Sequence, residues 1–364
     1  MITLYWYWKI PSFLSKDSLW AASLVSLSIS GNAKASYAIT SSDGTAAGSD
    51  AQKGLGISNE FTLGASGELD NGYSWSYAID IDSVESSATN DDAKLTLTTP
   101  NGTIGIFLGE GGLGVDNAGS QSVIARPSDT SYGEAMTDTF DIDGFDNIQY
   151  HTPADLLPFG ITFKVGHAPN AVATQGNDFK ATGTIHDRIA SADTAAIGGI
   201  TLDGGGSSVT HYQVKANPVE GLNIGADYLE FSGVIGATDQ APESGAYFAT
   251  YSFGPATIGY SKSYAALALT SAATPAEVES VENDKFSIGF NVSDNLSVSY
   301  EEEESDATMK NKATTHGKIT SSGIQAAYTM GGMTLGVALN DHENAAYTKN
   351  KDVKDTVFTV QMAF

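Results

Sequence analysis

Strict alternation of apolar and polar side chains is the feature of this sequence that most limits its fold. From residue 25 to residue 40, apolar or small residues such as Val25, Leu27 and Ile29 take every second position, and mostly serines stand between them. Successive side chains of a β-strand point to opposite faces, so the pattern predicts one strand with an apolar face and a polar face. At about sixteen residues, this strand is longer than is usual in soluble sheets.

The same alternation recurs to the last residue, and two kinds of segment interrupt it. Short breaks rich in Gly, Asn, Asp and Pro supply the backbone conformations that tight hairpins need. Long breaks, polar and often acidic, alternate with the short ones along the chain. Together they predict sixteen strands, at residues 25–40, 53–69, 73–83, 92–99, 103–109, 146–152, 159–167, 207–216, 222–231, 244–253, 256–265, 283–291, 296–304, 318–330, 333–340 and 354–364.

An even number of antiparallel strands with tight turns on one side and long loops on the other is typical of a membrane barrel. We therefore expect an all-β fold, a 16-stranded antiparallel transmembrane β-barrel with short periplasmic turns and long extracellular loops. Its lumen should hold water, because side chains cannot fill a barrel of this size. The alternative is a soluble barrel or sandwich, which would turn its apolar faces inward and would not need alternating loop lengths.

The last segment, DTVFTVQMAF, carries the alternation to the chain end. Its larger apolar residues share one face: Phe358, Val360, Met362 and Phe364. Closing the barrel leaves no strand edge without a partner, so we expect this face to contact lipid.

Residues 1–24 are expected to form an export signal or an atypical leader, and residues 25–364 the barrel. Lys9 and Lys16 precede a short apolar stretch, which is the order of charge and hydrophobicity in export signals. Two cleavage positions compete. A cut near Ala21 or Ala22 preserves the first strand, whereas a cut after the small-x-small triplet 33–35 would destroy it.

Charge and composition exclude several functions. The chain has 43 Asp and Glu against 18 Lys and Arg, a formal charge of -25, which argues against a nucleic acid partner. The absence of Cys excludes disulfides and thiolate metal sites. The six histidines are scattered, and no nucleophile-elbow motif occurs. We therefore predict that the protein is not an enzyme and needs no cofactor.

Three segments resemble general porins of Gram-negative bacteria: the terminal strand ending in Phe364, the hairpin GELDNGYS at 67–74, and DNIQYHTP at 146–153 after a long third loop. The resemblance covers residues 25–364, although the loop lacks the usual Pro-Glu-Phe-Gly-Gly tip. It implies a homotrimer in the outer membrane and passive diffusion of small hydrophilic solutes and ions. It also implies that the third loop folds into the pore. The barrel-assembly machinery would read the terminal strand as its signal, through Phe358, Val360, Met362 and Phe364.

The third long break, residues 110–145, is the expected pore constriction. It contains Arg126 and the following acids: Glu110, Asp116, Asp129, Glu134, Asp138, Asp141 and Asp143. Acids around a narrow aqueous pore create a negative potential that concentrates cations, so we predict a cation-preferring channel. Across the pore, Lys34 and Lys94 of the early strands, with Lys164 further round the wall, would form a basic wall and produce a transverse field. The alternative is that these acids only solvate the loop.

Two further acidic segments raise the question of bound cations. Asp141, Asp143 and Asp146 resemble the opening of a calcium loop, but Thr152 stands where the distal Glu is required. A loosely bound divalent cation such as Ca²⁺ is thus a secondary hypothesis. The acidic run 301–304 is expected to be a solvated face, with divalent bridging to lipopolysaccharide of the outer leaflet as the alternative.

Two other functions stay open at this point. A substrate-selective channel would need a row of aromatic and charged residues along the lumen, which the sequence cannot locate. A surface adhesin or structural protein would use the barrel only to anchor its long loops, such as those at 110–145 and 168–206. A flux measurement separates these functions, because an anchor with a filled lumen passes little solute.

Overall fold

The computed structural model describes residues 25–43, 52–84, 87–130, 138–169, 182–184, 201–203, 208–233, 239–267, 278–310, 317–347 and 349–364. The predicted leader and Glu134 lie outside these residues. No helix in the described part of the chain is both long enough and apolar enough to cross a membrane.

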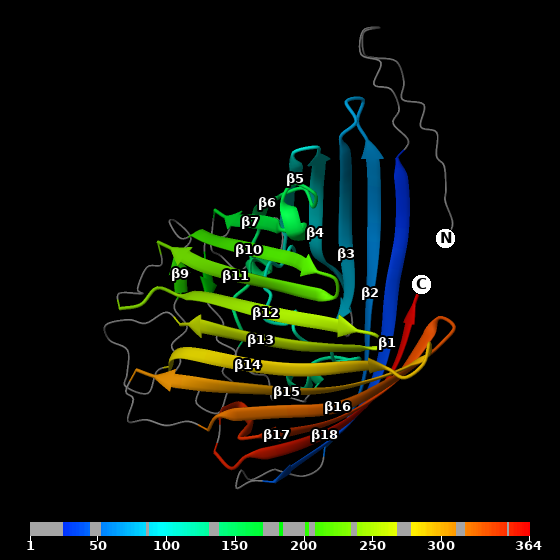
Figure 1. Cartoon of the computed structure of the whole chain (residues 1–364), viewed down its shortest axis with the longest axis vertical. Helices are drawn as coiled ribbons and strands as arrows, with labels where there is room; N and C mark the ends of the chain where they lie inside the picture. Colours follow the sequence, from blue (N-terminus) through cyan, green and yellow to red (C-terminus); the bar gives the residue numbers. More distant parts are fainter. Residues whose placement is uncertain are drawn as a thin grey trace.

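Sixteen strands form one closed antiparallel barrel, which confirms the predicted fold class (Figure 1). The first strand, β1, pairs on one side with β2 and on the other with the last strand, β18, so the barrel closes between the two ends of the sheet. The barrel strands are β1 (Ser26–Asp43), β2 (Gln52–Glu68), β3 (Ser74–Val84), β4 (Ser87–Thr99), β5 (Gly102–Leu108), β6 (Asn147–His151), β7 (Thr162–Ala168), β10 (Ser208–Val219), β11 (Leu222–Ser232), β12 (Glu243–Phe253), β13 (Ala256–Ala266), β14 (Val278–Asn291), β15 (Leu296–Met309), β16 (Ile319–Met330), β17 (Met333–Glu343) and β18 (Asp352–Ala363).

Alternation places apolar side chains on the outside of the barrel and polar side chains on the inside. Ile57 and Leu335 face outward and are exposed. For Ile57, 73% of the residue surface is accessible. On the inner face, Gln213, Ser263 and Gln325 are buried. An apolar surface of this kind is stable only against lipid, so the burial pattern fits a barrel whose solvent is a membrane.

Several strand ends differ from the sequence prediction. The predicted long break at 84–91 is wrong, because β3 reaches Val84 and β4 already begins at Ser87. A register shift between Asp80 and Ile81 accommodates the longer pairing. Backbone hydrogen bonds can extend a strand beyond its apolar belt, whereas the alternation that we read marks only the belt. For the same reason β15 continues to Met309, past the predicted end at 304.

The predicted long break at 168–206 contains two short strands that the sequence did not indicate. They are β8 (Thr182–Thr184) and β9 (Thr201–Asp203), which pair with each other in a separate sheet. Three short 3-10 helices complete the described elements: η1 (Ile142–Gly144), η2 (Pro158–Gly160) and η3 (Ala345–Tyr347).

Phe364 completes the closure of the barrel. It exchanges two backbone hydrogen bonds with Gly31 of β1, at 2.9 and 3.0 Å, and its ring centroid lies 5.3 Å from that of Phe61 on β2. A Cβ added to Gly31 would lie 2.4 Å from the carbonyl oxygen of Glu60 and 3.0 Å from the Phe364 ring. The glycine therefore allows the close approach that this contact requires.

The segment between β5 and β6, residues 110–145, is called the third loop below. It contains the one-turn helix α1 (Pro127–Thr130) and η1. Its Leu113 and Ile142 pack with Val209 of β10 and Leu229 of β11 in a buried apolar cluster. These wall residues point into the barrel, so the third loop lies inside it.

Candidate functional site

The third loop is fastened to the inner wall at three places, and the first is His211 on β10. The carboxylate of Asp141 in the loop lies 3.3 Å from the His211 Nδ1, and that of Asp227 on β11 lies 3.2 Å from its Nε2. Asp141 also accepts the backbone N–H groups of Leu113 and the next residue, each at 2.8 Å. Burial alone would raise the pKa of Asp141, but His211 and these two N–H groups outweigh burial and lower it.

The second fastening point joins Lys285 of β14 to Arg126 of the loop through one shared acid, Asp138. Asp138 accepts from Arg126 Nη2 at 2.8 Å and from Lys285 Nζ at 3.0 Å. Lys285 also reaches Asp116 at 3.3 Å, and Arg126 pairs with Asp129 at 2.9 Å. Burial would raise the pKa of Asp138, yet Lys285 and Arg126 hold it well below its usual value. For Asp116 burial prevails and raises the pKa.

The third fastening point lies on β15. Glu301 accepts the hydroxyls of Ser120 and Ser122, the first at 2.7 Å, and Glu303 accepts the backbone N–H of Ser128 at 3.0 Å. Both glutamates are fully buried. The expectation that the whole run 301–304 is a solvated face is therefore wrong for these two. The sequence did hold a signal, because the alternation places them on the face opposite Tyr300.

Wall side chains also bind backbone groups of the loop. Val123 donates to Ser299 Oγ at 3.0 Å, Ile124 donates to Gln325 Oε1 at 2.9 Å, and the carbonyl of Asp116 accepts from a serine of β13 at 2.7 Å. Buried backbone groups need such partners, because losing a hydrogen bond to water without replacement is costly. The loop is thus fitted to the wall from β10 to β16.

The acids predicted to line the constriction divide into two groups. Asp116, Asp138 and Asp141 bond to residues of the wall, whereas Asp129, which pairs with Arg126 of the loop, and Asp143 are exposed. Glu110 is half-buried and bonded to Lys94 of β4. The role of these acids in ion selectivity stays a prediction, and the structure adds that several of them also hold the loop.

The basic residues predicted for the pore wall lie on inner faces of their strands. Lys34 of β1 shares its face with the buried Thr359 of the neighbouring β18, as the register shows. Lys164 on β7 alternates with the exposed, outward Phe163. Lys34 and Lys94 thus lie on β1 and β4, whereas Lys164 lies on β7, the neighbour of the loop-bearing strand β10.

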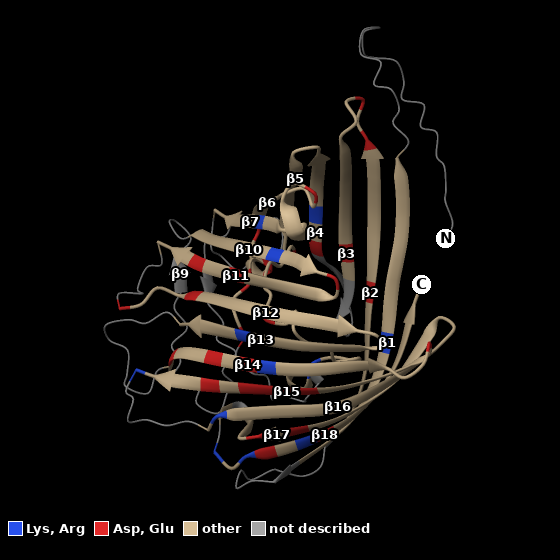
Figure 2. Ribbon diagram, viewed as in Figure 1, with Lys and Arg blue, Asp and Glu red and all other residues tan. Residues whose placement is uncertain are grey.

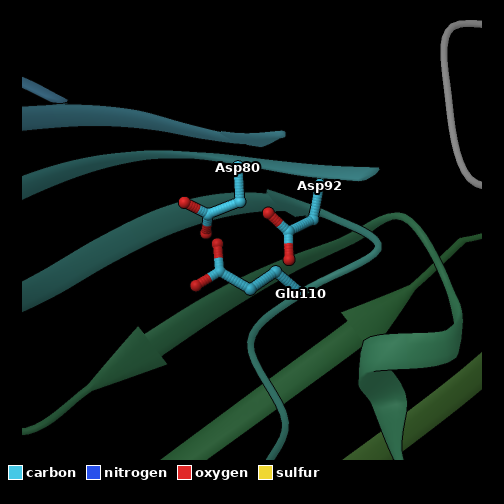
Figure 3. Close-up of side chains that lie close together, drawn as sticks. All are labelled: Asp80, Asp92 and Glu110. Atoms are coloured by element: carbon cyan, nitrogen blue, oxygen red, sulfur yellow. The ribbon is translucent and has the colours of Figure 1, made fainter. Parts of the chain in front are cut away.

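Three carboxylates converge beside Lys94: those of Asp80 on β3, Asp92 on β4 and Glu110 at the start of the loop (Figure 3). Among the described residues they are the only group of three or more His, Asp or Glu side chains close enough together to hold a metal ion. Lys94 already supplies one positive charge to this group.

The calcium hypothesis placed a cation elsewhere, at Asp141, Asp143 and Asp146. The structure does not bring these three acids together into such a group, and Asp141 is already occupied by His211 and backbone N–H groups.

Comparison with solved structures finds the same architecture. An anion-selective porin from Comamonas acidovorans has a TM-score of 0.63 at 13% identity, covering 93% of this chain and 100% of that one. The fold is that of a bacterial outer-membrane porin. Salmonella typhi OmpF in complex with daunomycin gives 0.63 and 13%, covering 93% and 98%, and the outer-membrane channel DcaP of Acinetobacter baumannii gives 0.62 and 13%, covering 93% and 97%. No family model and no curated protein matches the sequence.

The porin fold, the closed sixteen-strand barrel and its apolar outer surface support the predicted location, a multi-pass protein of a Gram-negative outer membrane. At 13% identity the likeness concerns the fold, so neither solute nor ion preference transfers from these neighbours. One of them is described as anion-selective, and the comparisons therefore give no support to the predicted cation preference.

Proposed function

We propose that this chain is a diffusion porin, through which small hydrophilic solutes and ions cross the outer membrane without an energy source. The observation that carries the proposal is the fastening of the third loop to the wall. Ion pairs and hydrogen bonds hold it against β10 to β16, while polar side chains line the opposite strands. A loop held in this way narrows a water-filled lumen and leaves a passage beside it.

The preference for cations is a finer part of the same proposal. Around the fastening points, acids outnumber cationic groups: Asp116, Asp129, Asp138, Asp141, Asp227, Glu301 and Glu303 stand against Arg126, Lys285 and His211. The excess negative charge lies in a low-dielectric wall, where it is poorly screened and attracts cations into the lumen.

Assembly and partners follow from the same resemblance. We propose a homotrimer embedded in outer-membrane lipid and lipopolysaccharide, inserted by the barrel-assembly machinery. The exposed terminal side chains support this assembly role, since Phe358, Val360, Met362 and Phe364 all face outward at the closure of the barrel. No enzymatic activity and no cofactor are part of the proposal.

The test is a conductance measurement on purified protein in a planar bilayer under a potassium chloride gradient. Large current steps that reverse toward the potassium potential are expected. Steps that reverse toward the chloride potential would support the porin function and contradict the cation preference. Correctly folded barrels that give no steps would overturn the channel itself and favour a barrel that only anchors its surface loops.

A further inference from the structure

A basic patch on the inner wall is not explained by the fastening of the loop. It consists of Lys164 on β7 and Lys215 on β10, and His151 of β6 borders it. His151 stands directly opposite Lys164 in the β6–β7 register. Lys164 pairs with Gln213, so Lys215 is its diagonal neighbour on the same face. Figure 2 shows the basic segments of β7 and β10 on these adjacent strands.

The patch faces the lumen on the turn side of the third loop. Gln213, two residues before Lys215, binds the backbone carbonyl of Leu113 in the loop at 2.6 Å, so the loop lies just beyond the patch. The side chains of His151, Lys164 and Lys215 are half-buried. The Lys215 Nζ lies over the Phe248 ring, 6.0 Å from its centroid. The His151 ring stacks on Phe107 at 6.2 Å, and its Nε2 is hydrogen-bonded to Gln149 Oε1 at 2.7 Å, so His151 borders the two lysines without adding a charge to them.

Neither lysine of the patch has an acid bound to it, and unlike the inward Lys34 the two lie on adjacent strands. Within the described part of the chain, Arg126, Lys285 and Lys94 each have a carboxylate partner, whereas no ion pair joins Lys164 or Lys215 to any acid. This contrast occurs in a chain with 43 acids and 18 basic residues. Like charges held side by side in a half-buried wall repel each other, and a bound anion relieves that repulsion.

The nearest acids are committed elsewhere. Asp227 accepts the backbone N–H of Val115 at 2.7 Å and contacts His211, and Asp141 is held by His211 and by two N–H groups of the loop. Because these acids are held by other partners, neither of them is paired with Lys164 or Lys215.

The geometry points to an anion subsite here, in which Lys164 and Lys215 bind the oxyanion group of a passing solute. The ligand class is a small solute that carries a phosphate group, since a dianion matches two ammonium groups. Because the patch faces the lumen, a membrane lipid headgroup is not its ligand. The inference deepens the proposed porin function by naming a solute class.

Inorganic phosphate is the probe for the experiment, with folded full-length protein in detergent. Binding is followed by phosphorus-31 NMR line broadening at neutral pH. The variant Lys164→Gln/Lys215→Gln is expected to weaken binding at least tenfold, while Lys164→Arg/Lys215→Arg keeps it because both charges remain. Lys262→Gln is the matched control: Lys262 is paired with Asp284 on the other side of the sheet, and its loss should change nothing.

The same proteins are then tested in the bilayer, with phosphate added on the turn side. Wild-type current should fall with phosphate concentration, and that of the glutamine variant should not. Saturable binding that the glutamine variant abolishes supports the subsite even if no channel opens, in which case only the porin proposal fails. Open channels whose phosphate binding is absent, or is equal in the wild type and the glutamine variant, would overturn the subsite and leave the porin intact.

Discussion

Lys285 of β14 donates to Asp138 of the third loop over 3.0 Å, and the two residues are 147 positions apart in the chain. Almost no surface of the lysine side chain is accessible to solvent. A buried cation of this kind stabilises a structure only while its acids remain in place. The contact therefore makes the position of the loop sensitive to single substitutions in the wall.

Replacing Lys285 with Met should loosen the loop and destabilise the barrel. The variant removes one cation from Asp116 and Asp138, and breaking a buried pair in this way typically costs about 3–5 kcal/mol. Thermal unfolding followed by circular dichroism should show a lower midpoint, and single-channel recordings should be noisier. Lys262→Met serves as control, because exposed pairs contribute only about 0–1 kcal/mol. Equal shifts for both variants would contradict the role given to Lys285.

The position of the loop should resist mild acid. The pKa of Asp138 is depressed in the folded protein, so its contribution to stability is complete above the ordinary value of about 4 and is lost only as the pH falls below it. Asp116 has a raised pKa, and its protonation relieves the cost of burying its charge. We expect no loss of the Asp138 contribution between neutral pH and about pH 4, and therefore no transition in single-channel conductance over this range in the variant Asp116→Asn. A transition near pH 6 that persists in Asp116→Asn would contradict this assignment.

Ion preference should respond to the acids beside Lys94. The double variant Asp80→Asn/Asp92→Asn should move the reversal potential toward that of chloride, and Lys94→Gln should move it toward that of potassium, since each changes the local charge of the lumen. Asp294→Asn, in an exposed turn, should leave the potential unchanged. Opposite signs for the first two variants are the result that matters, and equal signs would exclude an electrostatic effect.

Deleting Phe364 should impair assembly while leaving the conductance of assembled pores unchanged. The deletion removes two backbone hydrogen bonds to Gly31 and the ring contact with Phe61 at the closure of the barrel. The measurement is the fraction of heat-modifiable, folded barrel in isolated membranes. Met362→Leu, which keeps volume and hydrophobicity, is the control. Normal assembly of the shortened chain would show that the terminal residue is dispensable.

The sequence alone was enough to predict most barrel strands. One face of each strand contacts lipid and the other faces the lumen, so apolar and polar residues alternate along the chain with a period of two. The strand predicted at 256–265 is Ala256–Ala266, and the one predicted at 318–330 is Ile319–Met330. Strand extensions above the apolar belt were missed, since backbone pairing there does not require alternating side chains.

The partners of the loop were beyond the reach of sequence reasoning. Alternation assigned Glu301 and Glu303 to the inner face, but it could not show that a segment from residues 120–128 would cover them. His211 seemed one of six scattered histidines until the register placed it between Asp141 and Asp227. Contacts between distant parts of a chain depend on strand order and register around the barrel. A local sequence pattern therefore does not predict which residues the loop contacts.

The long-range contacts of the third loop also limit the order in which parts of the protein can fold. The backbone N–H of Ile124 donates to Oε1 of Gln325, which lies 201 residues further along the chain. Ordering the loop before β14 to β16 exist would cost loop-closure entropy without any compensating contact. The part of the loop that contacts β14 to β16 can therefore settle only after those strands are in place, although its contacts with β10 and β11 can form earlier. The final position of the loop is thus a late product of folding, which depends on strands made long after the loop itself.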